Sequence, residues 1–84
     1  MALPTEPVTL SVAEIEELNK KLSMMRHDVN GKLSLLTLAV GAFQLQPESG
    51  ERWLNVMAEQ PQKIVADITK FSREMEAALR ITRP

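Results

Sequence analysis

The chain has 84 residues and a net charge of −1, with 44% hydrophobic and 25% charged residues, a single histidine and no cysteine. This length allows one domain at most, and the lack of cysteine excludes disulfide and thiol chemistry. The near-neutral charge leaves no basic surface for nucleic acid or anionic lipid, so we expect neither a nucleic-acid nor a membrane partner.

Residues 1–10 contain Pro4 and Pro7 and show little hydrophobic periodicity, so we expect a disordered lead or linker there. They have neither the positive segment nor the apolar core of a signal peptide. The densest apolar stretch, residues 33–43, is too short to span a bilayer. We therefore expect a cytoplasmic protein.

A first helix is expected over residues 11–46. Ser11 and Glu14 have the spacing of a capping box, in which each side chain accepts a hydrogen bond from the backbone amide of the other residue. A helical projection gathers the apolar residues into a stripe about 80° wide. The stripe comprises Ile15, Leu18, Leu22, Met25, Val29, Leu33, Leu36, Val40 and Phe43.

The second half of this helix is also apolar on its outer side, at Leu35, Leu38, Ala42 and Leu45. One partner helix from the same chain cannot cover a helix that is apolar nearly all round. A second chain can cover it, so we expect self-association.

A proline and a glycine among the polar residues 46–50 predict the loop of a hairpin. The second helix is expected over residues 51–81, with a bend or a break at Pro61. The predicted fold is all-α: an antiparallel two-helix hairpin over residues 11–82 that homodimerises into a four-helix bundle. The polar side of the second helix is expected to hold Lys63, Asp67, Lys70, Arg73 and Glu74.

His27 projects about 160° from the centre of the apolar stripe and is expected to face solvent. A zinc or di-iron site needs about three or four convergent ligands. The positions one turn further along are Asn30 and Gly31, so we expect no metal site. A neutral imidazole carries a free ring nitrogen without special activation, so the chemistry that fits His27 is nucleophilic attack on phosphorus.

Residues 26–33, Arg-His-Asp-Val-Asn-Gly-Lys-Leu, resemble the H-box of the dimerisation and histidine-phosphotransfer domain of sensor histidine kinases. The resemblance covers nearly the whole chain, because those domains are helical hairpins of similar length that pair as four-helix bundles. Two positions depart from the family pattern: Gly31 stands where Thr or Asn is usual, and Lys32 where Pro is usual. The matching positions are His27, Asp28, Val29 and Leu33.

The resemblance implies that His27 is the phosphoacceptor, attacking through Nε2, and that Asp28 orients the imidazole and acts as its base. Arg26, Asn30 and Lys32 are expected as further contacts of the phosphoryl group. In the family, the residue at the Gly31 position places water for dephosphorylation of the partner, so phosphatase activity is not expected unless Asn30 takes that role.

The implied partners are the receiver domain of a response regulator and an ATP-binding kinase domain, either separate or downstream in a longer chain. No glycine-rich phosphate loop is present, so we expect no cofactor in this chain, with ATP and magnesium held by the partner domains. The resemblance then implies that the chain is the phosphoacceptor component of a two-component phosphorelay. It would be one part of a histidine kinase or phosphotransferase and not a complete kinase.

Two other interpretations remain. A structural dimerisation or adaptor hairpin would carry His27 without a function, and burial of the histidine against the second helix would favour it. A single-chain phosphotransfer domain folded as a monomeric bundle is less favoured, because the sequence predicts two long helices where four are needed.

Overall fold

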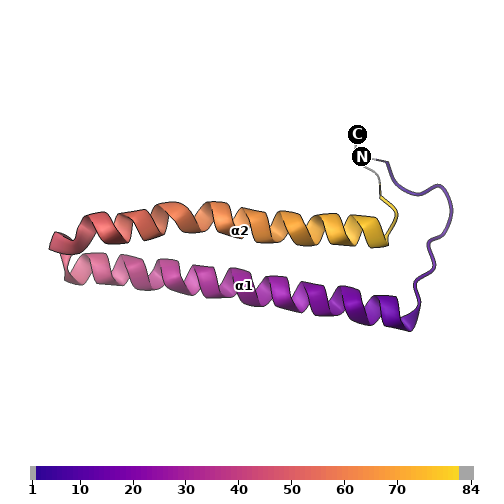
Figure 1. Cartoon of the computed structure of the whole chain (residues 1–84), viewed down its shortest axis with the longest axis horizontal. Helices are drawn as coiled ribbons and strands as arrows, with labels where there is room; N and C mark the ends of the chain where they lie inside the picture. Colours follow the sequence, from indigo (N-terminus) through magenta and orange to yellow (C-terminus); the bar gives the residue numbers. More distant parts are fainter. Residues whose placement is uncertain (1, 82–84) are drawn as a thin grey trace.

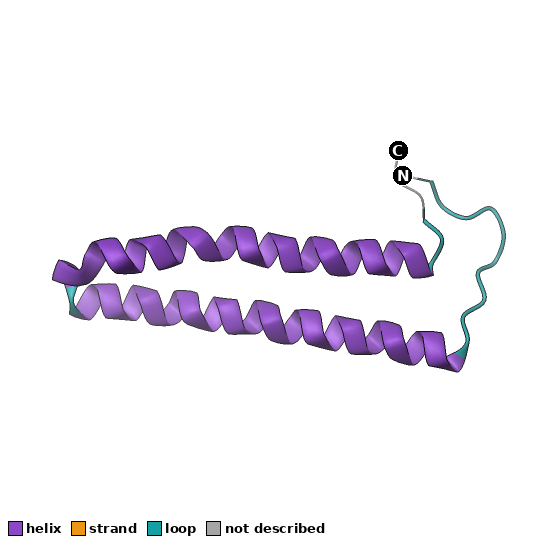
Figure 2. Ribbon diagram, in the orientation of Figure 1, coloured by secondary structure: helices purple, strands orange, loops and turns teal. Residues whose placement is uncertain are grey.

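The computed structural model describes residues 2–81, and its regular elements are helices. Helix α1 spans Val12–Leu45, the short 3₁₀ helix η1 spans Pro47–Ser49, and helix α2 spans Gly50–Ala78. The two long helices lie side by side and antiparallel, joined at one end by η1 (Figure 1). The molecule is a single layer of two helices with extents of 59 × 28 × 11 Å (Figure 2). An all-α chain whose two long helices pack against each other is therefore confirmed.

The start of α1 is fixed by the expected capping box. The Ser11 hydroxyl accepts a hydrogen bond from the Glu14 amide, and the Glu14 carboxylate accepts one from the Ser11 amide, both at 3.1 Å. The pKa of the Glu14 carboxyl is lowered below its usual value, chiefly by the hydrogen bond from the Ser11 amide and further by the Ser11 hydroxyl and the nearby charge of Arg80. The expected ends of the lead and of the hairpin, residues 1 and 82, lie outside the described residues.

The end of α2 is set by Arg80, which has a left-handed backbone with φ of 57°. The amide of Ile81 donates to the Glu76 carbonyl at 2.8 Å, and the amide of Arg80 donates to the Ala77 carbonyl at 3.3 Å. This is the hydrogen-bond pattern of a Schellman motif, which satisfies the last carbonyls of a helix. It ends α2 at Ala78, three residues before the expected end.

Of the bend or break expected at Pro61, the break does not occur, because α2 is one continuous helix from Gly50 to Ala78. Pro61 lies on an exposed side of the helix. A proline removes one helical hydrogen bond, and its ring crowds the preceding turn. On this side the turn around Pro61 meets solvent and not α1.

The contact between the helices follows alternating steps of three and four residues, the period of a coiled coil. All of these residues are buried or half-buried, and we call them the hairpin seam. Its α1 members are Leu18, Leu22, Met25, Val29, Lys32, Leu36, Ala39 and Phe43, and its α2 members are Gly50, Trp53, Met57, Gln60, Ile64, Asp67, Phe71, Glu74 and Ala78.

The seam corrects the expected apolar stripe in its second half. Lys32 and Ala39 face α2, whereas Leu33 and Val40 remain about half exposed. A projection at 3.6 residues per turn drifts away from a contact that repeats every 3.5 residues. Ile15 also stays exposed, because α1 extends beyond the end of α2 (Figure 1).

The seam also corrects the expected polar side of α2. Asp67 and Glu74 belong to the surface that meets α1, and Gln60 is buried there with 5% of its surface exposed. Within residues 2–81, Ala39 is the one buried hydrophobic residue, and no large side chain is fully buried. A single hairpin therefore encloses almost no apolar core.

Gly50 lies directly against the Phe43 ring at the loop end of the hairpin. A Cβ placed on Gly50 would lie 2.7 Å from Cε2 of the Phe43 ring. This position is the first residue of α2, directly after η1. The absence of a side chain lets Phe43 pack over the start of the second helix.

Candidate functional site

His27 lies on the outer side of α1, opposite the hairpin seam. The seam residues nearest to it in sequence are Met25 and Val29, so the histidine is two positions from each and falls on the far face of the helix. The side chain is exposed, as the helical projection predicts. Within residues 2–81 it makes no hydrogen bond or ion pair, so both ring nitrogens are accessible.

Asp28 follows His27 but points to a different side of the helix, because consecutive residues are about 100° apart. Asp28 is exposed and borders a groove of about 370 Å³ between the two helices. No hydrogen bond joins it to His27 among the bonds of the described chain. The structure therefore brings Asp28 toward α2, and a contact with the imidazole requires its carboxylate to swing outward.

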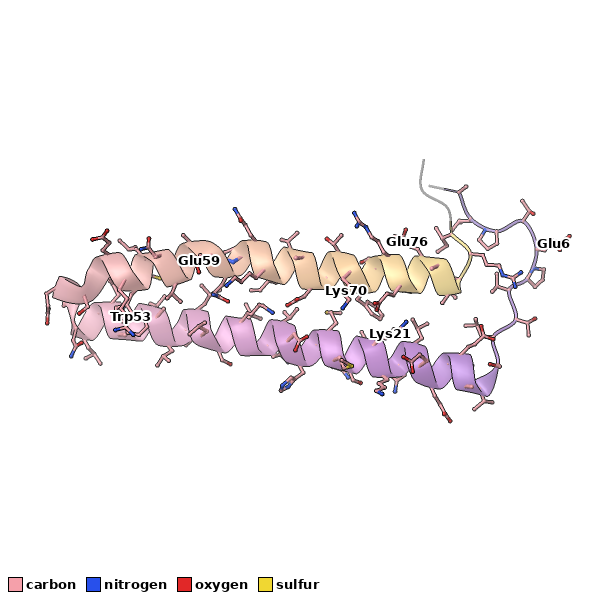
Figure 3. The ribbon with its side chains drawn as sticks, in the orientation of Figure 1. Glu6, Lys21, Trp53, Glu59, Lys70 and Glu76 are labelled. Atoms are coloured by element: carbon pink, nitrogen blue, oxygen red, sulfur yellow. The ribbon has the colours of Figure 1, made fainter. Side chains whose placement is uncertain are left out.

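The groove beside Asp28 is mixed in charge, and we call it the charged groove. It is lined by three apolar side chains, three lysines and four carboxylates. Lys21 of α1 and Lys70 of α2 border it from opposite helices (Figure 3). The residues that line it are Glu17, Lys20, Lys21, Met24, Met25, Asp28, Asp67, Lys70, Phe71 and Glu74.

Lys32 is not beside His27 in space. Its Nζ lies 2.5 Å from Oδ2 of Asp67 across the hairpin seam, and the two side chains are 26% and 24% exposed. Because this ammonium is held by a carboxylate of α2, it is not free to meet a phosphoryl group on His27. The structure therefore assigns Lys32 to the helix contact and not to the site.

Arg26 and Asn30 remain exposed on the same stretch of α1 as His27. The Arg26 guanidinium donates a hydrogen bond of 3.5 Å to the Ser23 hydroxyl, which keeps it one turn before the histidine. Gly31 is also exposed, and a Cβ built there meets no atom within 4 Å. The outer surface around His27 is therefore open and polar, with room for a larger side chain at Gly31.

Sequence reasoning missed the charged groove and the ion pair in the seam. The sequence does contain a signal for the ion pair, which is a seven-residue repeat of polar residues in α2 at Gln60, Asp67 and Glu74. In an antiparallel pair such a repeat faces the equivalent repeat of the other helix. Lys32 belongs to the repeat of α1, so the pairing of opposite charges was readable once both repeats were aligned.

Residues 2–81 contain no group of three His, Cys, Asp or Glu side chains placed to hold a metal ion. None of the helices in this part of the chain is long and apolar enough to cross a membrane. No family model, curated protein or solved structure matches the chain.

Proposed function

We propose that this chain is the phosphoacceptor and dimerisation hairpin of a two-component phosphorelay, with His27 as the phosphoryl carrier. The observation that carries the proposal is the position of this imidazole. It is exposed on a continuous helix, takes no part in the hairpin seam and makes no bond to another described residue. A nucleophile that must meet a second protein needs this placement.

In the proposed reaction, Nε2 of neutral His27 attacks the phosphorus atom of the donor. A P–N bond forms while the P–O bond to the donor breaks, and the departing oxygen keeps that electron pair. The imidazole is then positively charged, and its Nδ1 proton passes to the Asp28 carboxylate or to water. Attack by an aspartate of the acceptor on the same phosphorus reverses these steps and frees the imidazole.

The chain needs partners for this chemistry. We propose that an ATP-binding kinase domain, in a longer chain or a separate protein, supplies the phosphoryl group together with ATP and magnesium. The acceptor is the receiver domain of a response regulator, and both partners act in the cytoplasm. Two copies of the hairpin pair as a four-helix bundle, because one hairpin has almost no apolar core of its own.

The competing function is a structural dimerisation or adaptor hairpin. That alternative would be favoured by a histidine buried against α2, and His27 is instead exposed on the opposite side of α1. Both functions share the same fold and differ in one property, which is whether the imidazole accepts a phosphoryl group.

Phosphoramidate, a small phosphoryl donor with a P–N bond, tests this property without a cognate kinase. We expect intact-mass spectrometry to show one added phosphoryl group that is lost in acid and stable in alkali. His27→Gln should add none, and the variant Asn19→Ala, at another exposed position of α1, should be modified like the parent. Equal modification of parent and His27→Gln, or of neither, would rule out the phosphocarrier role.

A further inference from the structure

Helix α2 carries a second row of residues with the same alternating spacing, on one side of the two-helix layer. The row carries no charge and is apolar apart from Ser72, and we call it the outer row. Leu54, Val65 and Ile68 within it are 53%, 62% and 44% exposed. The outer row comprises Leu54, Ala58, Pro61, Val65, Ile68, Ser72, Met75 and Leu79.

Two exposed apolar residues of α1, Leu33 and Val40, lie on the same side of the layer as this row. The Lys32–Asp67 contact sets the register of the hairpin, and each residue that follows a seam position lies on the same side of both helices. Leu33 follows Lys32 and Ile68 follows Asp67, so these two side chains share one side of the layer. Leu33 is 47% exposed, and Val40, one repeat further along, is 45% exposed.

The other side of the two-helix layer has the opposite character. It holds the charged groove, and along α2 it continues with Lys63 and Arg73. The Lys63 ammonium lies 3.8 Å from the Glu59 carboxylate on this helix, in a solvent-exposed pair. Leu35 and Leu38 of α1 are exposed toward this side, but the α2 surface beside them is charged. The two sides of the layer therefore differ. On α2 only one side is uncharged, and on that side α1 contributes the half-exposed Leu33 and Val40 in its half nearer the loop, with Arg26 and Asn30 nearer its N-terminus.

We infer that a second copy of this chain packs on the apolar face formed by Leu33, Val40, Leu54, Val65 and Ile68. This inference rests on the homodimer of the proposed function and names its surface. A second copy fits because the outer row runs the length of α2 and has the coiled-coil period that another long helix requires. The layer is also only 11 Å thick and lacks a core, and stacking two layers face to face supplies one.

Two equivalent layers stacked in this way use the same surface on each copy, as a twofold dimer requires. The charged groove with Asp28 then stays on the outside of the assembly. His27 stays outside too, because it lies on the edge of α1 away from α2. Arg26 and Asn30, which follow seam positions, lie on the side that faces the second copy, whereas the His27 imidazole itself stays accessible in the dimer.

Sedimentation velocity at micromolar concentration tests this surface. We expect the parent to sediment as a dimer of about twice 9.4 kDa. The double variant Val65→Glu, Ile68→Glu should weaken the dimer more than about 100-fold, because two carboxylates would be buried in the interface. The matched double variant Ala66→Glu, Thr69→Glu, at exposed positions one residue further along α2, should stay dimeric.

The variant Val65→Ala, Ile68→Ala introduces no charge and covers the case in which the glutamates unfold the hairpin. It should keep the helical circular dichroism of the parent and weaken the dimer about 10-fold or more. Two results would overturn the inference. One is a monomeric parent. The other is a dimer that is unaffected by the glutamate and alanine variants of Val65 and Ile68 but is split by Leu35→Glu, Leu38→Glu. Phosphoramidate labelling of His27 is measured in a separate experiment. The proposed phosphorylation and the proposed dimer surface can therefore be refuted independently of each other.

Discussion

Replacing Asp67 with asparagine tests whether the ion pair in the hairpin seam holds the two helices together. Asp67→Asn keeps the shape of the side chain and removes the charge opposite Lys32. The charged atoms are 2.5 Å apart, and about three quarters of each side chain is buried. Breaking a fully buried pair costs about 3–5 kcal/mol, and an exposed pair about 0–1 kcal/mol. With solvent screening, we expect a loss of about 2 kcal/mol, or roughly 30-fold in the folding equilibrium.

The matched control is Glu59→Gln, which removes the carboxylate of the exposed pair with Lys63. Its atoms are 3.8 Å apart and its side chains are 63% and 56% exposed, so the expected change is below about 0.5 kcal/mol. Urea unfolding followed by circular dichroism measures both, at one protein concentration because pairing of chains adds a concentration-dependent term. If Asp67→Asn destabilises no more than Glu59→Gln, the pair does not hold the seam.

A double variant separates charge pairing from packing. Lys32→Met combined with Asp67→Leu replaces both charges by apolar groups of similar length, which is often neutral or stabilising for a buried pair. We expect its free energy of unfolding to match or exceed that of the parent. A double variant as unstable as Asp67→Asn would show that the loss comes from disturbed packing and not from an unpaired lysine.

Three further predictions concern stability and can be read from the same unfolding curves. Arg80→Gly should stabilise by about 1 kcal/mol, because Arg80 has a positive φ that only glycine adopts without strain. The pKa of Glu14 is lowered in the folded chain, so its contribution is complete above its unfolded pKa and is lost as pH falls through the lower folded value. The difference in stability between the parent and Glu14→Gln should therefore shrink as the solution is acidified, and a constant difference would contradict the capping role. Gly31→Ala should stabilise by about 0.5–1 kcal/mol and leave the proposed phosphorylation of His27 unchanged, since a Cβ there meets nothing within 4 Å.

Local signals in the sequence predicted the elements well, because the groups that decide a helix end lie close together along the chain. The Ser11–Glu14 capping box and the breaker residues before α2 are of this kind. The exposure of His27 also followed from sequence, since it depends on one helix and its apolar stripe. Its role as a phosphoacceptor stays a proposal, because exposure alone does not select a chemistry.

The partners across the seam were not predicted, because they depend on the register between two helices. Lys32 was interpreted as a surface residue beside His27, and Asp67 as part of the solvated side of α2. Charged residues are usually exposed, so a single-helix pattern places them in water. Here Lys32 and Asp67 are instead half-buried, because each helix places an opposite charge at the position that faces the other.

In α2, polar residues interrupt the row that faces α1, and apolar residues fill most of the outer row. We expect this distribution to make the stability of the hairpin depend on the pairing of two copies of the chain. Three positions of the row that faces α1 are Gln60, Asp67 and Glu74, whereas the outer row has no charge. Polar groups within the hairpin fix its register but contribute little net stability. A larger hydrophobic gain is available on the outer row and on Leu33 and Val40 of α1, once a second copy covers them. The free energy of unfolding should therefore rise with protein concentration, and a hairpin whose stability is independent of concentration would contradict this division.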